Sequence, residues 1–164
     1  MLRFGVIGYG GRIRGIINGL KQFDVPFTIA AITDPKGPEY KDQFADDLKD
    51  TVLYEDADQM LDTEQLDGVL VGTRCSLHTP SALKVAQRKL PLFLEKPVAT
   101  SMEQVRALAE AFADYAPQVV VSFPLRLTTL ALTTKEIIES GRLGSIEHVQ
   151  AWNNVPYGWV YYGN

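Results

Sequence analysis

Residues 2–20 read LRFGVIGYGGRIRGIINGL and contain the pattern that decides the fold. An apolar run from Leu2 to Ile7 enters a cluster of glycines and continues with apolar residues at helical spacing. A strand that turns through glycines into a helix presents unpaired backbone amides and the positive end of the helix dipole to an anion. Gly8 permits the tight turn and Gly10 lets the backbone approach phosphates, so this unit predicts a pyrophosphate site.

The loop departs from the GxGxxG pattern at its third glycine, where Ile13 stands. Gly11 lies two positions earlier and does not replace that glycine. Because glycines also punctuate ordinary turns, the loop taken alone is as compatible with a plain turn as with phosphate binding. Its candidate cofactor-binding residues are Gly8, Gly10, Gly11, Arg12 and Ile13, and residues elsewhere in the chain must decide between the two interpretations.

The composition describes a globular chain, because 46% of its 164 residues are hydrophobic and 22% are charged. This length suits one domain with a sizeable core. A formal net charge of -4 without a basic block argues against a nucleic-acid partner. The single cysteine excludes an intrachain disulfide framework. With no signal peptide, no long apolar segment and no metal motif, we expect a cytoplasmic protein that has no metal site and does not enter a membrane.

Short β-rich runs alternate with amphipathic stretches, which predicts a parallel sheet with crossover helices. The runs are continuously apolar, as expected where both faces of a sheet are covered. The six predicted strands are Leu2–Ile7, Phe27–Thr33, Val52–Tyr54, Gly68–Val71, Leu92–Leu94 and Val119–Phe123. Right-handed crossovers wind such units into a Rossmann-type, doubly wound α/β fold, whose ligand crevice lies at the carboxyl ends of the strands.

One of the connecting helices carries its own start signal. It is predicted to begin at Thr100 or Ser101, where Glu103 or Gln104 can complete a capping box. Its predicted apolar face consists of Val105, Leu108, Ala109 and Phe112.

Asp34 follows the second predicted strand, about two dozen residues after the glycine turn, near the spacing expected for the acidic partner of an adenosine ribose. Its carboxylate can accept both ribose hydroxyls and would repel a 2′-phosphate, which favours NAD over NADP. Lys36 can instead pair with that phosphate, so NADP stays open. The plain alternative is that Asp34-Pro35 only begins a turn. Together with the upstream glycines, the cofactor interpretation is favoured.

Residues 68–80, GVLVGTRCSLHTP, end a buried strand and place polar side chains in the loop that follows it. Thr73, Ser76 and His78 are predicted to line the crevice, because the loop lies at a strand's carboxyl end. His78 either contacts the nicotinamide ribose or a substrate, or is only a residue at the start of a helix.

Residues 92–105, LFLEKPVATSMEQV, place Glu95, Lys96 and Pro97 directly after a short apolar strand. An arbitrary Glu-Lys pair is usually a solvated surface pair. The position at a strand end and the following proline favour a site instead. A lysine at such a position can donate a hydrogen bond to an oxygen atom and stabilise negative charge that develops on it.

In order and spacing, GVIGYGG, ITDP, GTRCSLHTPSAL and EKPVATSMEQ resemble the glucose-fructose oxidoreductase, inositol dehydrogenase and MocA family of dehydrogenases over nearly the whole chain. The resemblance implies NAD as cofactor and a sugar, cyclitol or related polyol as substrate. It implies that Lys96 is the catalytic lysine beside the nicotinamide, with Glu95 orienting nearby groups and Pro97 shaping the turn. Arg126 matches the arginine that usually follows the last strand of the cofactor domain.

The resemblance also divides the chain into residues 1–122, a dinucleotide-binding domain, and residues 123–164, the start of a second, α+β substrate and dimerisation domain. In the second part, Thr128–Ser140 reads as a helix stopped at Gly141. Ile146–Trp152 is predicted to be the first strand of a largely antiparallel sheet.

The resemblance further implies that relatives continue past the point where this chain stops, at Asn164, and supply there a histidine and an aspartate that assist proton transfer. We therefore expect an amino-terminal portion that is incomplete for catalysis. Its lone last strand should be disordered, folded back or paired with a second copy in a homo-oligomer. Five aromatic residues near the end of the chain are predicted to belong to the core of that sheet: Trp152, Tyr157, Trp159, Tyr161 and Tyr162. Two functions stay open, a hydride-transferring oxidoreductase and a non-catalytic dinucleotide-binding or sensing module.

Overall fold

The computed structural model describes residues 1–115 and 118–153, and within these ranges six parallel strands form one sheet in the order β3-β2-β1-β4-β5-β6. The strands are β1 (Leu2–Ile7), β2 (Phe27–Thr33), β3 (Val52–Tyr54), β4 (Gly68–Val71), β5 (Leu92–Leu94) and β6 (Val119–Val121). The first five predicted strands are confirmed to the residue. The prediction for the sixth is two residues too long: the Ser122 N–H still donates to the Leu94 carbonyl at 2.9 Å, but Phe123 leaves the ladder.

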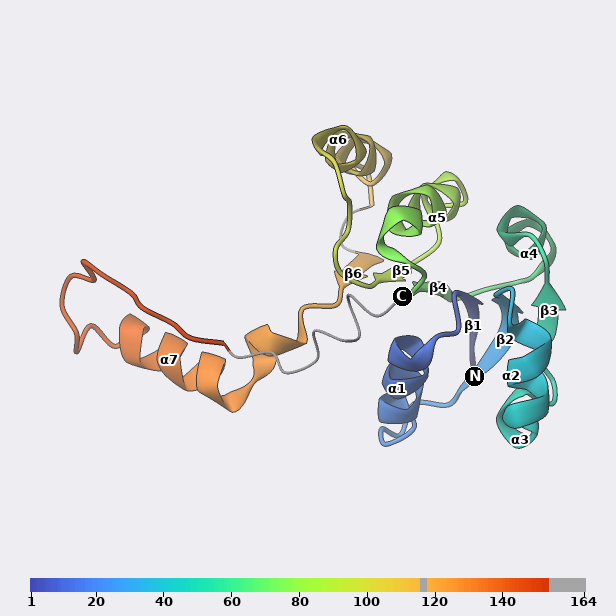
Figure 1. The fold of residues 1–164 in the computed structure, drawn as a ribbon, viewed down its shortest axis with the longest axis horizontal. Coiled ribbons are helices and arrows are strands. Elements are labelled where there is room, and N and C mark those ends of the chain that lie inside the picture. Colours follow the sequence, from blue (N-terminus) through green and yellow to red (C-terminus); the bar gives the residue numbers. More distant parts are fainter. Residues whose placement is uncertain (116–117, 154–164) are drawn as a thin grey trace. The chain divides into compact units, whose positions relative to one another are not determined.

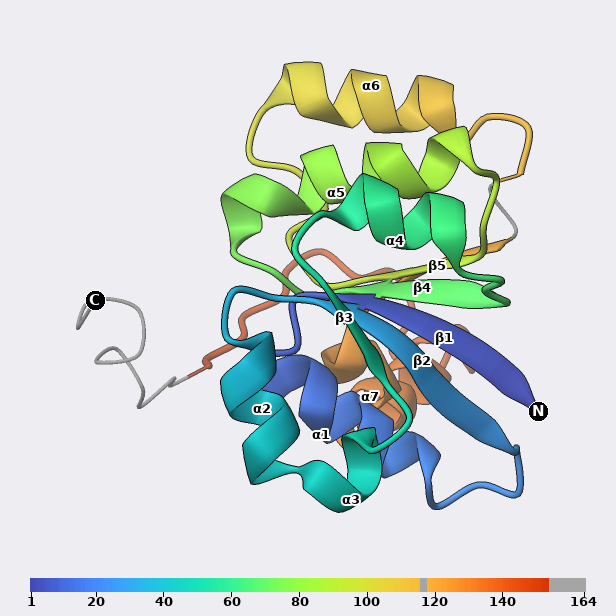
Figure 2. The same ribbon diagram turned by 90° about the vertical axis from the view of Figure 1, so that its right-hand side faces the viewer.

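Helices cover the two faces of this sheet, as Figures 1 and 2 show. One face carries α1 (Gly11–Leu20), α2 (Gly37–Gln43) and α3 (Ala45–Leu48), and the other carries α4 (Ala57–Thr63), α5 (Cys75–Gln87) and α6 (Met102–Ala111). β1 pairs with β2 on one side and with β4 on the other, so the order of the strands reverses between β1 and β4. The predicted doubly wound fold is confirmed, and its crevice is expected at the carboxyl ends of these strands.

The core has one cluster on each face, because successive residues of a strand point in opposite directions. Val6 packs with Ile13 and Ile17 of α1, whereas its neighbour Ile7 packs with Met60 and Val85 on the other face. All six side chains are nearly or fully buried. The continuous apolar runs of the central strands are thus explained by burial on both faces.

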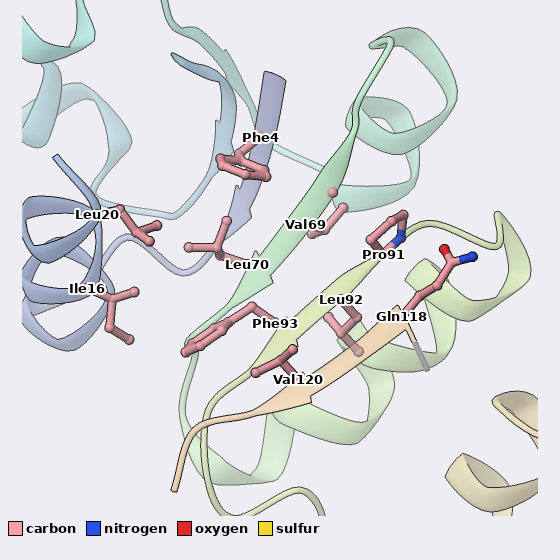
Figure 3. A pocket seen from close by; sticks show the side chains of 11 residues that line it. Phe4, Ile16, Leu20, Val69, Leu70, Pro91, Leu92, Phe93, Gln118 and Val120 are labelled. Carbon is pink, nitrogen blue, oxygen red and sulfur yellow. The ribbon is translucent and has the colours of Figure 1, made fainter. Parts of the chain in front are cut away.

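An apolar groove interrupts this cover on the α1 side of the sheet. Its volume is about 250 Å³, and Figure 3 shows side chains of α1 and of β4 to β6 facing it, among them Ile16, Leu20, Leu70, Phe93 and Val120. Val120 is 58% exposed. The prediction that both faces are covered therefore holds for the central strands but not for β6, because no helix of the described residues 1–123 covers that end of this face.

The start of α6 follows the predicted capping scheme. Ser101 Oγ accepts the Gln104 N–H at 3.2 Å, and Gln104 Oε1 accepts the Thr100 N–H at 2.8 Å. The helix therefore starts after Ser101, and Gln104 rather than Glu103 closes the box. Leu108 of the predicted apolar face is buried. Phe112 at the carboxyl end is buried as well, whereas Val105 and Ala109 are exposed and line a groove beside β6.

The chain divides into two compact units, Met1–Phe123 and Pro124–Asn164. The second contains a 3-10 turn, Pro124–Leu127, and helix α7, Thr129–Glu139. Thr128 Oγ1 caps this helix by accepting the Ala131 N–H at 3.3 Å, and Gly141 follows its end with a φ of +71°. The predicted helix is confirmed. Among the described residues, none of the helices combines the length and apolarity that crossing a bilayer requires.

The predicted strand Ile146–Trp152 is wrong, since residues 146–153 form no regular secondary structure. A strand needs a neighbour to pair its backbone groups. Within residues 124–153 the structure contains no second strand that could be that neighbour. Trp152 is 84% exposed rather than part of a sheet core. The predictions for Tyr157, Trp159, Tyr161 and Tyr162 lie outside the described residues.

Candidate functional site

A cavity of about 570 Å³ opens at the carboxyl ends of β1, β2 and β4, where the order of the strands reverses. It is lined by Gly8, Gly10, Thr33, Asp34, Pro35, Lys36, Tyr40, Gly72, Thr73, Arg74 and Leu77. Of the predicted site residues, Gly8, Gly10, Asp34 and Thr73 lie together here. Tyr40 and Leu77 were not predicted, and Arg74 was not singled out, although it lies in a loop that the sequence placed at the crevice.

Gly8 is required both by its conformation and by its surroundings. Its φ of +85° lies in the left-handed region, which disfavours any side chain. A Cβ built at Gly8 would lie 2.8 Å from the Thr73 nitrogen and 2.9 Å from the Gly72 oxygen. The turn after β1 therefore lies directly against the turn after β4, and these two turns form adjacent walls of the cavity.

Gly10 is required by the space it leaves open rather than by its conformation. It is the N-cap of α1, with φ −69° and ψ 174°, and no side chain accepts hydrogen bonds from the first turn of that helix. A Cβ at Gly10 would meet no atom within 4 Å, and one at Gly11 would meet only the side chain of Arg14. Open amides beside open space, at the positive end of a helix dipole, fit a diphosphate group.

The missing third glycine of the motif is replaced from the sheet. Ile13 is fully buried, and its side chain fills the space over Gly72. A Cβ built at Gly72 would lie 2.6 Å from Ile13 Cδ1 and closer still to Cγ1. The third glycine normally allows close packing of helix on strand. Here the strand end carries the glycine and the helix carries the side chain, so Ile13 serves packing under the loop and does not line the cavity.

Tyr9 anchors the glycine loop in the core. Its side chain is buried, and its ring packs edge-on against Tyr40 at a centroid distance of 5.7 Å. Burial raises the pKa of the Tyr9 phenol, the charge of Asp47 adds to that rise, and the guanidinium of Arg14 opposes it. The phenol is therefore neutral at physiological pH.

Asp34 holds the glycine loop and its own turn at the same time. Its Oδ2 accepts the Tyr9 N–H at 2.8 Å, and its Oδ1 accepts the Lys36 N–H at 2.8 Å. The interpretation of Asp34-Pro35 as a turn is thus confirmed. Each carboxylate oxygen keeps a second lone pair, so the side chain can still accept ribose hydroxyls. That cofactor role stays a prediction.

Arg12 and Glu95 join the glycine loop to the strand ends beside it. Glu95 is 5% exposed, and its Oε1 accepts a hydrogen bond from Arg12 Nε at 2.8 Å. Arg12 Nη2 donates to Ser122 Oγ at 3.2 Å. Glu95 is thus not half of a solvated pair with its neighbour. Lys96 itself is exposed and makes no ion pair with any described residue.

His78 joins the cavity to the Glu95–Pro97 segment. It is 2% exposed, with Nδ1 2.7 Å from the Pro97 oxygen and Nε2 3.0 Å from the Thr73 oxygen. Both partners are carbonyl groups, which only accept, so a neutral ring satisfies one of them and a doubly protonated ring satisfies both. Thr79 Oγ1 adds a hydrogen bond to the Val98 oxygen at 3.0 Å. His78 lies inside α5, with both ring nitrogens facing the chain's own backbone.

The predicted site residues thus fall into two groups that are physically connected. The cavity group is linked to Glu95, Lys96 and Pro97 by the Arg12–Glu95 ion pair and by the His78 bridge. Ser76 is exposed in the first turn of α5 and does not line the cavity. Arg126 belongs to the second unit. The cofactor roles of these residues stay predictions.

A family model supports the assignment that the geometry suggests. The model is the Gfo/Idh/MocA family, described as an oxidoreductase family with an NAD-binding Rossmann fold, and it matches residues 2–123. The chain belongs to this family. The resemblance seen in the sequence is confirmed, and the Gfo/Idh/MocA match covers the entire sheet and the cavity.

Individual relatives agree with this family. The chain is 25% identical over 156 residues to the rhizopine catabolism protein MocA of Rhizobium meliloti, which covers 94% of this chain and 48% of that protein. It is 28% identical over 144 residues to inositol 2-dehydrogenase of Pseudomonas fluorescens, which covers 87% of this chain and 43% of that protein. The chain therefore spans about half the length of these curated relatives.

A solved structure confirms the Gfo/Idh/MocA fold. The myo-inositol dehydrogenase of Lactobacillus casei, determined in complex with NAD(H) and myo-inositol, superposes with a TM-score of 0.78 at 24% sequence identity. The match covers 88% of this chain and 43% of that chain.

Proposed function

We propose that this chain is the dinucleotide-binding part of an oxidoreductase that moves a hydride between NAD and a hydroxyl-bearing carbon of a cyclitol, sugar or related polyol. The cavity at the strand-order reversal carries this proposal, because an open glycine turn and a ribose-type carboxylate line it together. Two of the relatives described above are named inositol dehydrogenases, and one was solved with NAD(H) and myo-inositol, which supports this class of cofactor and substrate.

The cavity residues divide the recognition of the cofactor between them. The open amides at the start of α1 donate to the diphosphate, and Asp34 accepts from the ribose hydroxyls of the adenosine. The negative charge of Asp34 disfavours a 2′-phosphate, which favours NAD over NADP. Lys36 lies in the same wall of the cavity and reduces that preference. The further residues that we propose to bind the cofactor are Gly11, Arg12, Thr73, Ser76, His78, Glu95, Pro97 and Arg126.

Lys96 is the proposed catalytic residue. Bound NAD supplies the hydride acceptor. The exposed ammonium of Lys96 can donate a hydrogen bond to the substrate oxygen and stabilise the negative charge that develops as its proton leaves. The backbone of this segment is held by Glu95, whose Oε2 accepts the Lys96 N–H at 3.3 Å and whose other oxygen is held by Arg12. Glu95 therefore acts as a positioning residue.

The same proposal assigns residues 1–122 to cofactor binding and residues 123–164 to the start of a substrate and dimerisation domain, in a protein of the cytoplasm. Fluorescence localisation of a tagged protein tests the compartment. Size-exclusion chromatography with light scattering tests whether the chain forms a homo-oligomer.

Cofactor binding is tested by titrating the 164-residue chain with NADH and NADPH and following nicotinamide fluorescence. Wild-type protein should bind NADH more tightly than NADPH. Asp34→Ala should weaken NADH binding by about tenfold and reduce the preference over NADPH, since both the hydroxyl contacts and the repulsion are lost. The exposed Asp24→Ala is the matched control and should change neither value. Absence of NADH binding by the wild-type protein would contradict the proposal.

Catalysis is tested on the full-length parent protein by following NADH absorbance while it is offered NAD with a panel of cyclitols, sugars and other polyols. Lys96→Met should abolish turnover and change the NADH dissociation constant less than threefold, because the lysine acts on the reacting oxygen rather than on the diphosphate. Lys89→Met is the control on an exposed lysine away from the site. Firm NADH binding without turnover on any polyol would favour the sensing function instead.

A further inference from the structure

Three helices, α1, α2 and α5, begin at the cavity without a side-chain cap, and α1 and α5 are the longer ones. The N-cap of α1 is Gly10 and the N-cap of α5 is Arg74, and both residues line the cavity. By contrast, the N-caps of α4, α6 and α7 are Asp56, Ser101 and Thr128, each of which accepts a hydrogen bond from the first turn of its helix. The amides at the start of α1 and α5 are thus left without a cap where the cavity opens, and both helix dipoles favour an anion near these ends.

The charged side chains of the cavity add to this preference. Three of its lining residues are charged, namely Asp34, Lys36 and Arg74. Both carboxylate oxygens of Asp34 already accept main-chain N–H groups. Neither Lys36 nor Arg74 forms an ion pair with a described residue, since the ion pairs found within residues 1–115 and 118–153 involve other cations. Asp34 balances one of these two cations, so the charged side chains of the cavity leave an excess of one positive charge.

Arg74 lies in the turn after β4, which packs against the glycine turn after β1. Gly8 is packed on the backbone of Gly72 and Thr73, so Arg74 is the residue that directly follows this contact. It therefore borders the cavity beside the glycine turn, whereas Lys36 follows Asp34 in the turn after β2, which the ribose is expected to reach. The turn that bears Arg74 and the start of α1 thus both border the cavity.

We infer that Arg74 is a further cofactor-binding residue, whose guanidinium holds the diphosphate of the dinucleotide from the turn after β4, beside the glycine turn. The inference rests on the proposed function, since it names a contact within the same cavity. A guanidinium presents paired N–H donors that match the oxygens of a phosphate, and charge-assisted hydrogen bonds of this kind are stronger than neutral ones.

The test is fluorescence titration of the 164-residue chain with NADH and with NADPH, on wild-type protein, Arg74→Gln and Arg74→Lys. Arg106→Gln is the matched control, because Arg106 is an exposed arginine on α6 that does not line the cavity. Arg74→Gln should raise the dissociation constants of NADH and NADPH by the same factor, about tenfold at low salt. Arg74→Lys should retain part of the affinity, and Arg106→Gln should leave it unchanged.

Salt dependence separates a direct contact from a structural effect. The ratio of the NADH dissociation constant of Arg74→Gln to that of the wild type should shrink at high salt, because salt screens the charge that the substitution removes. The melting temperature of Arg74→Gln should equal that of the wild type. An unchanged NADH dissociation constant, a ratio that salt does not alter, or a much larger loss for NADPH than for NADH would each overturn the assignment. Wild-type protein that binds no NADH would overturn the proposed function as well, whereas normal binding with an unaffected variant would overturn the Arg74 contact alone.

Discussion

Replacing Arg12 by methionine tests the ion pair that ties the glycine loop to the end of β5. The Glu95 side chain is 6% exposed and the Arg12 side chain is 54% exposed, with 2.8 Å between Nε and Oε1. Removing one partner of a fully buried pair costs about 3–5 kcal/mol. Water reaches the guanidinium end of this pair, so we expect Arg12→Met to lower the free energy of unfolding by about 2 kcal/mol. Glu95→Gln should lower it by about 1 kcal/mol, because the freed guanidinium is hydrated.

Urea denaturation of the wild type, both single variants and the double variant provides a double-mutant cycle. The double variant should be more stable than the sum of the single effects predicts, with a coupling energy of about 1 kcal/mol. The control is Lys21→Met, which removes an ion pair to Asp47 of the same 2.8 Å length whose side chains are 43% and 50% exposed. Its effect should stay below about 0.5 kcal/mol. Equal losses in Arg12→Met and Lys21→Met, or strict additivity in the cycle, would refute the assigned role of burial at Glu95.

Three further substitutions test other features of the site and its support. Gly10→Ala should change the free energy of unfolding by less than about 1 kcal/mol, because the backbone angles of Gly10 suit alanine and no atom lies in the way. The same substitution should weaken NADH binding about tenfold or more. An unaltered NADH affinity would mean that the phosphates bind elsewhere. Gly72→Ala should destabilise the fold by about 2–3 kcal/mol, because the added methyl group overlaps the side chain of Ile13. In denaturant titrations, adding Ile13→Ala to this variant should recover stability. A further loss of stability in the double variant would show that the overlap is not the cause. Arg88→Met should lower the melting temperature at pH 7, since hydrogen bonding by Arg88 lowers the pKa of Asp62 and contributes, after Lys84, to the lowered pKa of Asp58. A carboxyl group with a lowered pKa stabilises the fold at pH values above the ordinary carboxyl range, and this stabilisation is lost as the pH falls through the lowered pKa. The difference in melting temperature between Arg88→Met and wild type should therefore vanish in strong acid. An equal difference at pH 7 and in strong acid would contradict this explanation.

The fold was predictable because burial leaves its pattern in the local sequence. Strands buried on both faces read as continuous apolar runs, and the predicted bounds of β1 to β5 match the structure. The same reasoning overextended β6 to Phe123, since an apolar residue there does not reveal where the ladder ends. It failed at Ile146–Trp152, because an apolar run becomes a strand only if a partner strand is present, and local sequence does not show one.

The candidate site was predictable where the backbone itself forms it and not where side chains meet across the fold. Gly8, Gly10 and Asp34 follow from motif spacing alone. The pairing of Arg12 with Glu95 spans 83 positions and depends on how β1 and β5 are placed in the sheet. Arg74 carries no motif signal, because only the convergence of uncapped helix ends distinguishes it from other exposed arginines.

The Ile13–Gly72 contact makes the height of α1 above the sheet a joint property of two distant positions. Small residues at both would leave a void beneath the phosphate turn, and bulky residues at both would lift the helix and carry its amides away from the cavity. Evolution of this loop is therefore constrained to compensating exchanges, in which one position gains volume as the other loses it. A sequence motif that includes only the residues of the loop fails to match such a chain, although a glycine, Gly72, is present at the end of the neighbouring strand β4.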